Sequence, residues 1–255
     1  MKKRKFRPGW LTTLIGIVVL AVLINLGFWQ IRRGHGAEHV YQAFARGQKG
    51  PAKRVSSIQG IAAIARSHGG GPMYRHVKVH GDYDASHQML LDNRVNNDRL
   101  GYEVYTPLKL PGGGYVIVDR GWVPGYARRS MLPDVSVSSR ARTVTGMLTH
   151  FRQGGLKVAP QGTSHGWPRV VVYPDAQQVS QILHARVAPL LLLLDPTQPD
   201  GYVRHWKPQI MKPMRHYGYA FQWFAMAATL IVIWVWVNLK VVDDTEADGD
   251  GDDDG

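Results

Sequence analysis

Two long apolar runs, residues 10–28 and 219–239, constrain this chain more than any other feature of its sequence. Neither run contains a formally charged residue. At about 1.5 Å per residue, a helix over either run would be about 30 Å long, which matches the hydrocarbon core of a bilayer. The first run is longer than the apolar part of a usual secretory signal, and no A-x-A cleavage pattern follows it. We therefore expect two membrane-spanning helices, with the first retained as an anchor.

The charges around these runs predict a topology. Residues 1–9 carry five Lys and Arg residues directly before the first run. Such residues resist translocation and keep this end in the cytoplasm, although Arg32 and Arg33 on the other side of the span weaken the bias. We expect a basic cytoplasmic N-terminus, a central domain at 29–218 in the periplasm, and a disordered acidic cytoplasmic tail at 240–255. The expected location is the bacterial cytoplasmic (inner) membrane.

The central domain is predicted to be rich in β structure. Short alternating or apolar runs punctuated by Gly, Asn and Asp are typical of an antiparallel meander or barrel. The expected strands are 75–83, 88–95, 101–110, 115–123, 143–151, 169–173 and 189–195. The last of these holds five leucines and should be buried on both faces or lean on the membrane, because it is too short to span a bilayer.

Local signals complete the expected fold. Short helices are predicted at 38–44, 58–65 and 175–183, the last capped by Asp175. The Gly-rich segment 153–167 is expected to be mobile. The predicted fold class is α+β, with two transmembrane helices flanking a β-rich extracytoplasmic domain.

Several classes of chemistry are excluded or unsupported. The chain has no cysteine, which excludes disulfides, thiolate zinc sites and iron–sulfur clusters. It lacks a P-loop, an H-E-x-x-H motif and a G-x-S-x-G motif. Five aspartates are interpreted as solvated turn residues without an acid–base partner, namely Asp82, Asp84, Asp92, Asp98 and Asp119. Nothing in the sequence therefore indicates an enzyme.

The central region carries a surplus of Lys and Arg. Nucleic acid is an unlikely target for it, because a periplasmic domain rarely meets any. Anionic lipid headgroups or an acidic protein partner explain the surplus better.

His216 is the histidine whose position suggests a function. If the second helix continues one turn outward, His216, Ala220, Trp223 and Ala227 share one face by their i, i+4, i+7, i+11 spacing. The small alanines would let a flat ligand or the other helix approach closely. A neutral imidazole is also a good axial ligand for haem iron. The competing interpretation is a histidine that only anchors the helix at the membrane interface.

The exit of the first span supplies the remaining candidate side chains. It leaves the membrane on the same side as His216, so Gln30 and Arg33 should lie beside this histidine. Arg32, Arg33, Lys212 or Arg215 could pair with haem propionates. If this site binds haem, its candidate residues are His216 as axial ligand, together with Gln30, Arg33, Arg215 and Trp223.

Five short motifs follow one another in a fixed order over nearly the whole chain outside the acidic tail. They are LGFWQ at 26–30 with Arg33, LDNR at 91–94, GYEVYTPL at 101–108, VDRGWVP at 118–124, and His216 with YA at 219–220 and WF at 223–224. In this order, between two spans, they resemble the SURF1 (Shy1) family of assembly factors for haem–copper cytochrome oxidases.

The resemblance implies a non-enzymatic role in maturing the catalytic subunit of cytochrome oxidase. It implies haem a as cofactor near His216, and as partners the oxidase catalytic subunit, the haem a synthesis machinery and membrane lipid. Arg120, Gly121 and Trp122 match the family's R-G-W signature, for which we expect structural roles. Trp122 should pack in the domain core, and Gly121 should permit a turn or bulge.

Three functions remain open from the sequence. The leading one is an assembly factor that holds haem a near His216 and helps deliver it to nascent oxidase. The second is a cofactor-free scaffold that stabilises the nascent oxidase subunit through its spans. The third is a copper carrier using Met211 and Met214, which are soft ligands near His216 but are separated by Pro213.

Overall fold

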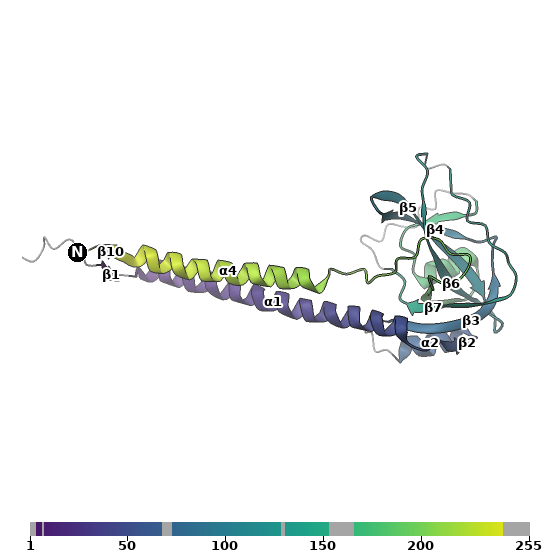
Figure 1. Cartoon of the computed structure of the whole chain (residues 1–255), viewed down its shortest axis with the longest axis horizontal. Helices are drawn as coiled ribbons and strands as arrows, with labels where there is room; N and C mark the ends of the chain where they lie inside the picture. Colours follow the sequence, from purple (N-terminus) through teal and green to yellow (C-terminus); the bar gives the residue numbers. More distant parts are fainter. Residues whose placement is uncertain (1–3, 7, 68–72, 129–130, 153–165, 242–255) are drawn as a thin grey trace, which may run out of the picture. The chain divides into compact units, whose positions relative to one another are not determined.

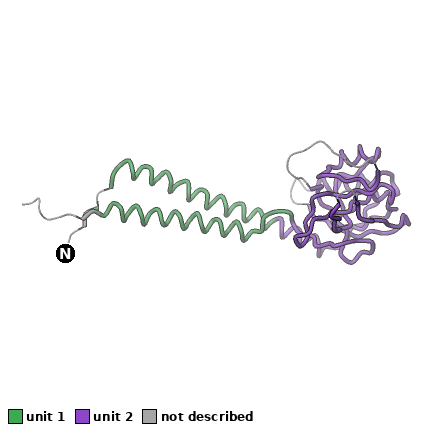
Figure 2. Tube along the Cα trace, turned by 90° about the horizontal axis from the view of Figure 1, so that it is seen from above, with its two compact units in different colours: residues 1–39, 209–255 green, residues 40–208 purple. Residues whose placement is uncertain are grey.

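The computed structural model describes residues 4–6, 8–67, 73–128, 131–152 and 166–241. The chain forms two compact units, residues 1–39 with 209–255, and residues 40–208 (Figure 2). The segment predicted to be mobile and the acidic tail lie almost entirely outside the described residues.

The first unit is built from two long helices, α1 (Trp10–Lys49) and α4 (Pro213–Asn238). Each is long and apolar enough to cross a membrane, which agrees with the two spans predicted from the sequence. The two helices lie side by side (Figures 1 and 2). Beyond their ends, β1 (Arg4–Phe6) pairs with β10 (Leu239–Val241) in an antiparallel ribbon.

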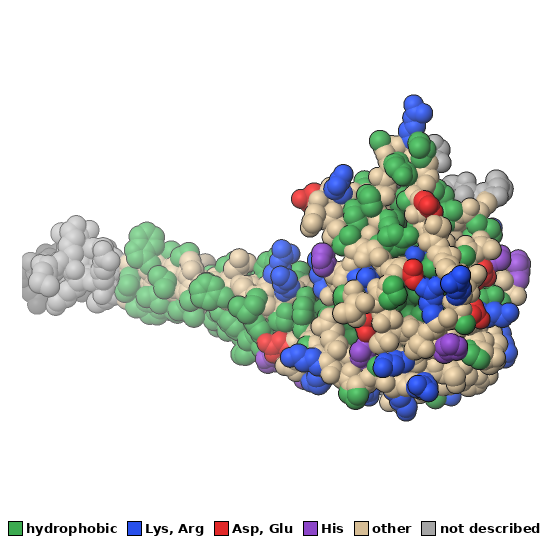
Figure 3. All heavy atoms as spheres, turned by 45° about the vertical axis from the view of Figure 1, so that its right-hand side comes forward, with side chains coloured by type: hydrophobic (Ala, Val, Ile, Leu, Met, Phe, Trp, Pro, Cys, Tyr) green, Lys and Arg blue, Asp and Glu red, His purple; other side chains and the backbone are tan. Residues whose placement is uncertain are grey.

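The surface of these helices is apolar. Phe221 is 74% exposed and Trp236 is 70% exposed, and hydrophobic side chains cover the helices in Figure 3. Large apolar side chains that face outward in this way are expected where lipid replaces water as the solvent. The short helix predicted at 38–44 is the continuation of α1, because no proline interrupts the helix between residues 29 and 49.

The second unit contains an eight-stranded sheet in the order β2-β3-β7-β9-β6-β5-β4-β8. The strands are β2 (Lys53–Val55), β3 (Arg75–Tyr83), β4 (Met89–Asn96), β5 (Arg99–Lys109), β6 (Tyr115–Pro124), β7 (Arg142–Thr149), β8 (Arg169–Val171) and β9 (Val187–Leu194). A further pairing of β3 with β5 closes β3, β7, β9, β6 and β5 into a barrel. The predicted barrel-like domain is thereby confirmed.

The sheet is mixed, however, and not antiparallel throughout. Three pairs are parallel, β2 with β3, β4 with β8, and β6 with β9. A parallel pair needs a long crossover between its strands, whereas the sequence pattern favours direct hairpins between neighbours. The mixed topology therefore arises from long-range pairing that the local pattern does not specify.

β9 lies at the centre of the domain core. Leu190, Leu192 and Leu194 face one hydrophobic cluster, to which α2 (Ile58–Arg66) contributes Ile61. Leu191 and Leu193 face a second cluster, to which α3 (Ala176–Leu183) contributes Val179. The five-leucine run is therefore buried on both faces, as predicted. The predicted cap of α3 is also present, since the Asp175 side chain accepts a hydrogen bond from the Gln178 amide.

The R-G-W signature has the structural role expected for its first two residues. Arg120 is buried, and its guanidinium donates to the Asp200 carbonyl, the Gln88 side chain and the Val135 carbonyl at 2.7–2.9 Å. Gly121 has a φ of +108°, and the β5–β6 register shifts beside it. A bulge with a left-handed residue favours glycine.

Trp122 differs from the prediction. Its side chain is partly exposed rather than packed in the core. The indole N–H donates to the Arg94 carbonyl at 3.0 Å, and the ring covers the backbone of Gly101. The reason is the bulge, because one extra residue in β6 breaks the strand alternation that the prediction assumed.

Candidate functional site

The site predicted from the sequence lies in the first unit, where α1 and α4 approach closely at glycines. A Cβ atom on Gly27 would lie 2.6 Å from ring atoms of Phe224, and one on Gly34 would lie 2.6 Å from the ring of Tyr217. Small residues of this kind let two helices pack at short range in a membrane. Gln30 is three residues after Gly27 and four before Gly34, so it lies on the same face of α1.

His216 lies against Gln30. Its Nδ1 atom is 2.9 Å from the Gln30 Oε1 atom. An amide oxygen can only accept, so Nδ1 carries the proton, and the lone pair of the neutral ring is on Nε2. Among the described residues, no hydrogen bond or ion pair engages Nε2. An Nδ1–H held by a second residue and an available Nε2 is the arrangement found in metal-ligating histidines.

The face of α4 that carries His216 is the one predicted from the spacing. Ala220 and Ala227 are buried on it, and Trp223 is half-buried. Bulky side chains such as Phe221 point away from this face and are exposed. The stripe on α4 therefore combines one imidazole with small residues that are already covered, which lets α1 pack closely against this face.

The predicted arginines lie at the surface of the same unit. The Arg33 guanidinium is 6.0 Å from the centroid of the Trp29 ring, and the side chains of Arg33 and Arg215 are exposed. No hydrogen bond or ion pair within the described ranges joins either arginine to His216 or to a carboxylate. The structure thus brings Gln30 and His216 together and leaves both guanidinium groups available.

The residues of the copper hypothesis are also exposed. Met211 is 42% exposed and Met214 is 75% exposed. The part of the chain that the structure describes contains no group of three His, Cys, Asp or Glu side chains that could hold a metal ion.

Sequence reasoning overlooked a pair of histidines on α1. His35 and His39 are both exposed and lie one helical turn apart. The prediction ended the first helix near residue 28, so it gave the pair no shared face. Because no third metal-ligating side chain joins them among the described residues, we assign this pair no role.

The interpretation of Asp119 as a solvated turn residue is wrong. Asp119 is fully buried in the middle of β6, and its Oδ1 atom accepts a hydrogen bond from the Gly121 amide at 3.1 Å. Burial raises the pKa of Asp119 well above its usual value, and the carboxylate of Glu103 raises it further. The signal for burial was its place at the centre of an apolar strand, since a turn residue would lie at a strand end.

Glu103 connects this aspartate to two arginines. Its Oε1 atom accepts hydrogen bonds from Arg94 at 3.2 Å and from Arg152 at 2.9 Å. All three side chains are largely buried. These charges are shielded from solvent and pair with one another. We therefore interpret the cluster as a structural feature that fixes how the strands align.

His76 forms a second polar link, half-buried, that the sequence did not predict. Its Nδ1 atom is 2.9 Å from the Gly50 carbonyl, and its Nε2 atom is 2.7 Å from the Asp195 carboxylate. Both partners only accept, so both ring nitrogens donate and the ring is an imidazolium. Burial lowers the pKa of His76, but the bonds to Asp195 and Gly50 outweigh that effect and leave this pKa raised. This ring ties the chain just after α1 to the end of β9.

Comparison with known proteins gives a consistent match. The SURF1 family model matches residues 17–228. A SURF1-like protein of Rickettsia felis is 21% identical over 236 residues, which cover 88% of this chain and 95% of the relative. A SURF1-like protein of Rickettsia bellii is also 21% identical over 236 residues, with 88% and 89% covered.

Proposed function

This chain belongs to the SURF1 family, and from that premise we propose that it is a membrane assembly factor that binds haem a at His216. Family membership implies a role in cytochrome oxidase assembly. The finer proposal is a non-enzymatic factor that receives haem a from its synthesis machinery and aids its insertion into the oxidase catalytic subunit. We place it in the bacterial inner membrane, with both termini cytoplasmic and residues 29–218 periplasmic.

The observation that carries the haem proposal is the hydrogen bond between Gln30 and His216. It fixes the proton on Nδ1 and leaves Nε2 with a lone pair, which is the form of imidazole that ligates iron. The bond between the two helices occupies Nδ1 alone, so it leaves Nε2 available for a ligand. The residues present therefore fit the cofactor that the family implies.

The neighbouring side chains have matching roles. The imidazole of His216 would coordinate the haem iron. Because it would be a single protein ligand, a ligand of the oxidase subunit could replace it when the haem is delivered. Ala220 and Ala227 are buried and let the two helices pack closely on the face that carries His216. Arg33 and Arg215, which have no carboxylate partner among the described residues, would pair with the propionates.

The test is the optical spectrum of the protein purified from cells that make haem a. Wild type should show a haem a spectrum, and His216→Ala should lose it while remaining in the membrane at the same level. His39→Ala is the matched control, because it removes an exposed histidine of the same unit. If His216→Ala retains as much haem as wild type and the control, the site is wrong.

A cofactor-free scaffold is the rival function, and the outward-facing apolar residues of α4 favour it. Phe221 and Trp236 would offer contact area to another membrane helix. This function predicts a colourless protein even from cells rich in haem a, which nevertheless copurifies with the oxidase catalytic subunit. It also predicts that Phe221→Ala, and not His216→Ala, reduces that copurification.

A further inference from the structure

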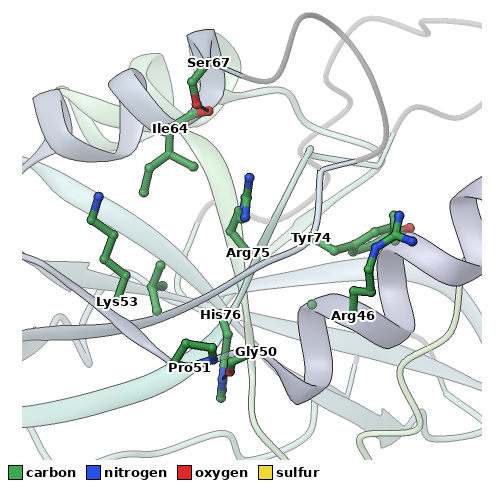
Figure 4. A pocket seen from close by; sticks show the side chains of 12 residues that line it. Arg46, Gly50, Pro51, Lys53, Ile64, Ser67, Tyr74, Arg75 and His76 are labelled. Atoms are coloured by element: carbon green, nitrogen blue, oxygen red, sulfur yellow. Dashed lines mark hydrogen bonds between the residues drawn. The ribbon is translucent and has the colours of Figure 1, made fainter.

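A cavity of about 610 Å³ lies in the second unit, at the junction of α1, β2, α2 and β3. Its size falls within the range of small-molecule sites, which is roughly 300–1,000 Å³. Figure 4 shows the side chains around it, which come from four separate elements. None of them belongs to the predicted haem site.

Three cations line this cavity from three directions. Arg46 comes from the last turns of α1, Lys53 from β2 and Arg75 from β3 (Figure 4). In the described part of the chain, no ion pair joins any of them to a carboxylate. A site with three unneutralised cations has a positive potential that attracts anions.

The sequence explains why these charges are unpaired. Between Glu38 and Asp82 the chain contains seven Lys and Arg residues and no Asp or Glu. All the elements that line the cavity come from this one stretch. A surface that only needed solubility would mix both signs of charge.

One residue of the cavity lining, His76, is paired with a carboxylate. His76 lines the cavity, and its imidazolium holds the Asp195 carboxylate at 2.7 Å. Asp195 therefore does not cancel the charge of Arg46, Lys53 or Arg75. Among the described residues that line the cavity, Arg46, Lys53 and Arg75 are cationic donors and none is a carboxylate.

Apolar side chains line the cavity between the cations. Ile64 of α2, Pro51 and the ring of Tyr74 line it. Tyr74 is held edge-on against Phe44 with ring centroids 5.1 Å apart, so its ring is a fixed wall. A ligand that fills this space should combine an anionic group with an apolar body.

We propose that this cavity binds a small organic phosphate. Arg46, Lys53 and Arg75 hold the phosphate oxygens, and the apolar body packs on Ile64 and Tyr74. Guanidinium groups match phosphate geometry with paired hydrogen bonds. A phosphate dianion carries more charge than a carboxylate, so it pairs better with several cations at once. This inference does not rest on the haem proposal.

The test is isothermal titration calorimetry of the full-length protein in a non-ionic detergent with 1-naphthyl phosphate. Binding should be saturable and should weaken as salt is raised, and 1-naphthol, which lacks the phosphate, should not bind. Arg46→Gln and Arg75→Gln should each weaken binding about tenfold or more, because each removes a charge-assisted hydrogen bond.

Matched controls remove the same charge outside the cavity. The controls are Arg54→Gln and Lys78→Gln. Arg54 lies on β2 and Lys78 on β3, beside the lining residues, but neither residue lines the cavity. They should change affinity less than twofold. Equal losses in the control and lining variants, or no binding of the probe, would overturn the proposal.

A second arm distinguishes a free phosphate from a lipid headgroup. Mixed micelles containing phosphatidic acid are titrated against the same variants. If the micelles compete with 1-naphthyl phosphate and lose this ability in Arg75→Gln, the phosphate site also accepts a lipid. If only the free probe binds, the ligand is a soluble phosphate.

Discussion

The imidazole of His216 and the amide of Gln30 join α4 to α1 through a 2.9 Å hydrogen bond between residues 186 positions apart in the sequence. The bond holds the proton on Nδ1 of His216, the proposed axial ligand. The tautomer of this imidazole therefore depends on how α1 and α4 pack. Gly27 and Gly34, one on each side of Gln30 along α1, permit that packing by their lack of a side chain.

Replacing Gln30 tests this dependence. Gln30→Leu keeps the volume of the side chain but removes the acceptor for Nδ1–H. Mutating the hydrogen-bond partner of a metal-ligating histidine typically lowers metal affinity about 10- to 100-fold. We therefore expect Gln30→Leu to lower haem affinity by this factor in a haem titration of the purified protein. Gln222→Leu, an exposed position on α4, should titrate as wild type does.

Glycines on α1 should differ sharply in their tolerance of alanine. A Cβ on Gly47 would lie 2.7 Å from the Tyr74 carbonyl oxygen, whereas one on Gly36 would meet nothing within 4 Å. We expect Gly47→Ala to lower the free energy of unfolding by about 1–3 kcal/mol. Gly36→Ala should leave it unchanged or raise it, since alanine favours a helix interior. Thermal unfolding in mild detergent compares them, and equal midpoints would contradict the close approach.

The buried charge cluster should respond unequally to two conservative changes. Glu103→Gln leaves Arg94 and Arg152 without their carboxylate, and breaking a buried pair costs about 3–5 kcal/mol. Asp119→Asn should cost about 1 kcal/mol or less, because burial and the Glu103 carboxylate raise the pKa of Asp119 and so already disfavour its charged form. Urea unfolding at pH 7 measures both, and the reverse order would contradict the expected difference between the two carboxyl groups.

The stability of the second unit should depend on pH through His76. Its pKa is raised in the folded protein, so its contribution is complete below about 6.5, the usual histidine value, and is lost as pH rises through the folded value. The difference in unfolding free energy between wild type and His76→Gln should therefore shrink from pH 6 to pH 9. His80→Gln, an exposed position on β3, should follow the wild-type profile.

The proposed topology can be tested by labelling, because the chain has no cysteine of its own. Ser139→Cys, at an exposed position of the central domain, should react with a membrane-impermeant maleimide in intact cells. Thr245→Cys, in the tail after α4, should react only after the cells are opened. The opposite pattern would place the central domain in the cytoplasm and remove the proposed site from the periplasmic face.

Local sequence patterns were sufficient for much of this fold. The two apolar runs specified long helices by their length alone, and the Asp175 cap and the leucines of β9 were readable because their signals depend only on near neighbours in the sequence. The spacing of His216, Ala220 and Trp223 also gave the correct helix face, since helix periodicity is fixed by backbone geometry.

Tertiary structure decided the rest. Whether Asp119 is buried depends on which strands cover β6, and its pKa is raised first by that burial and then by Glu103, which lies on another strand. The parallel partners of β9 and β2, the imidazolium of His76 and the cation-lined cavity likewise need residues that are distant in sequence to meet. Pairing and burial of this kind arise from the packing of the whole chain, so a local pattern can indicate which residues are candidates but not which of them come together.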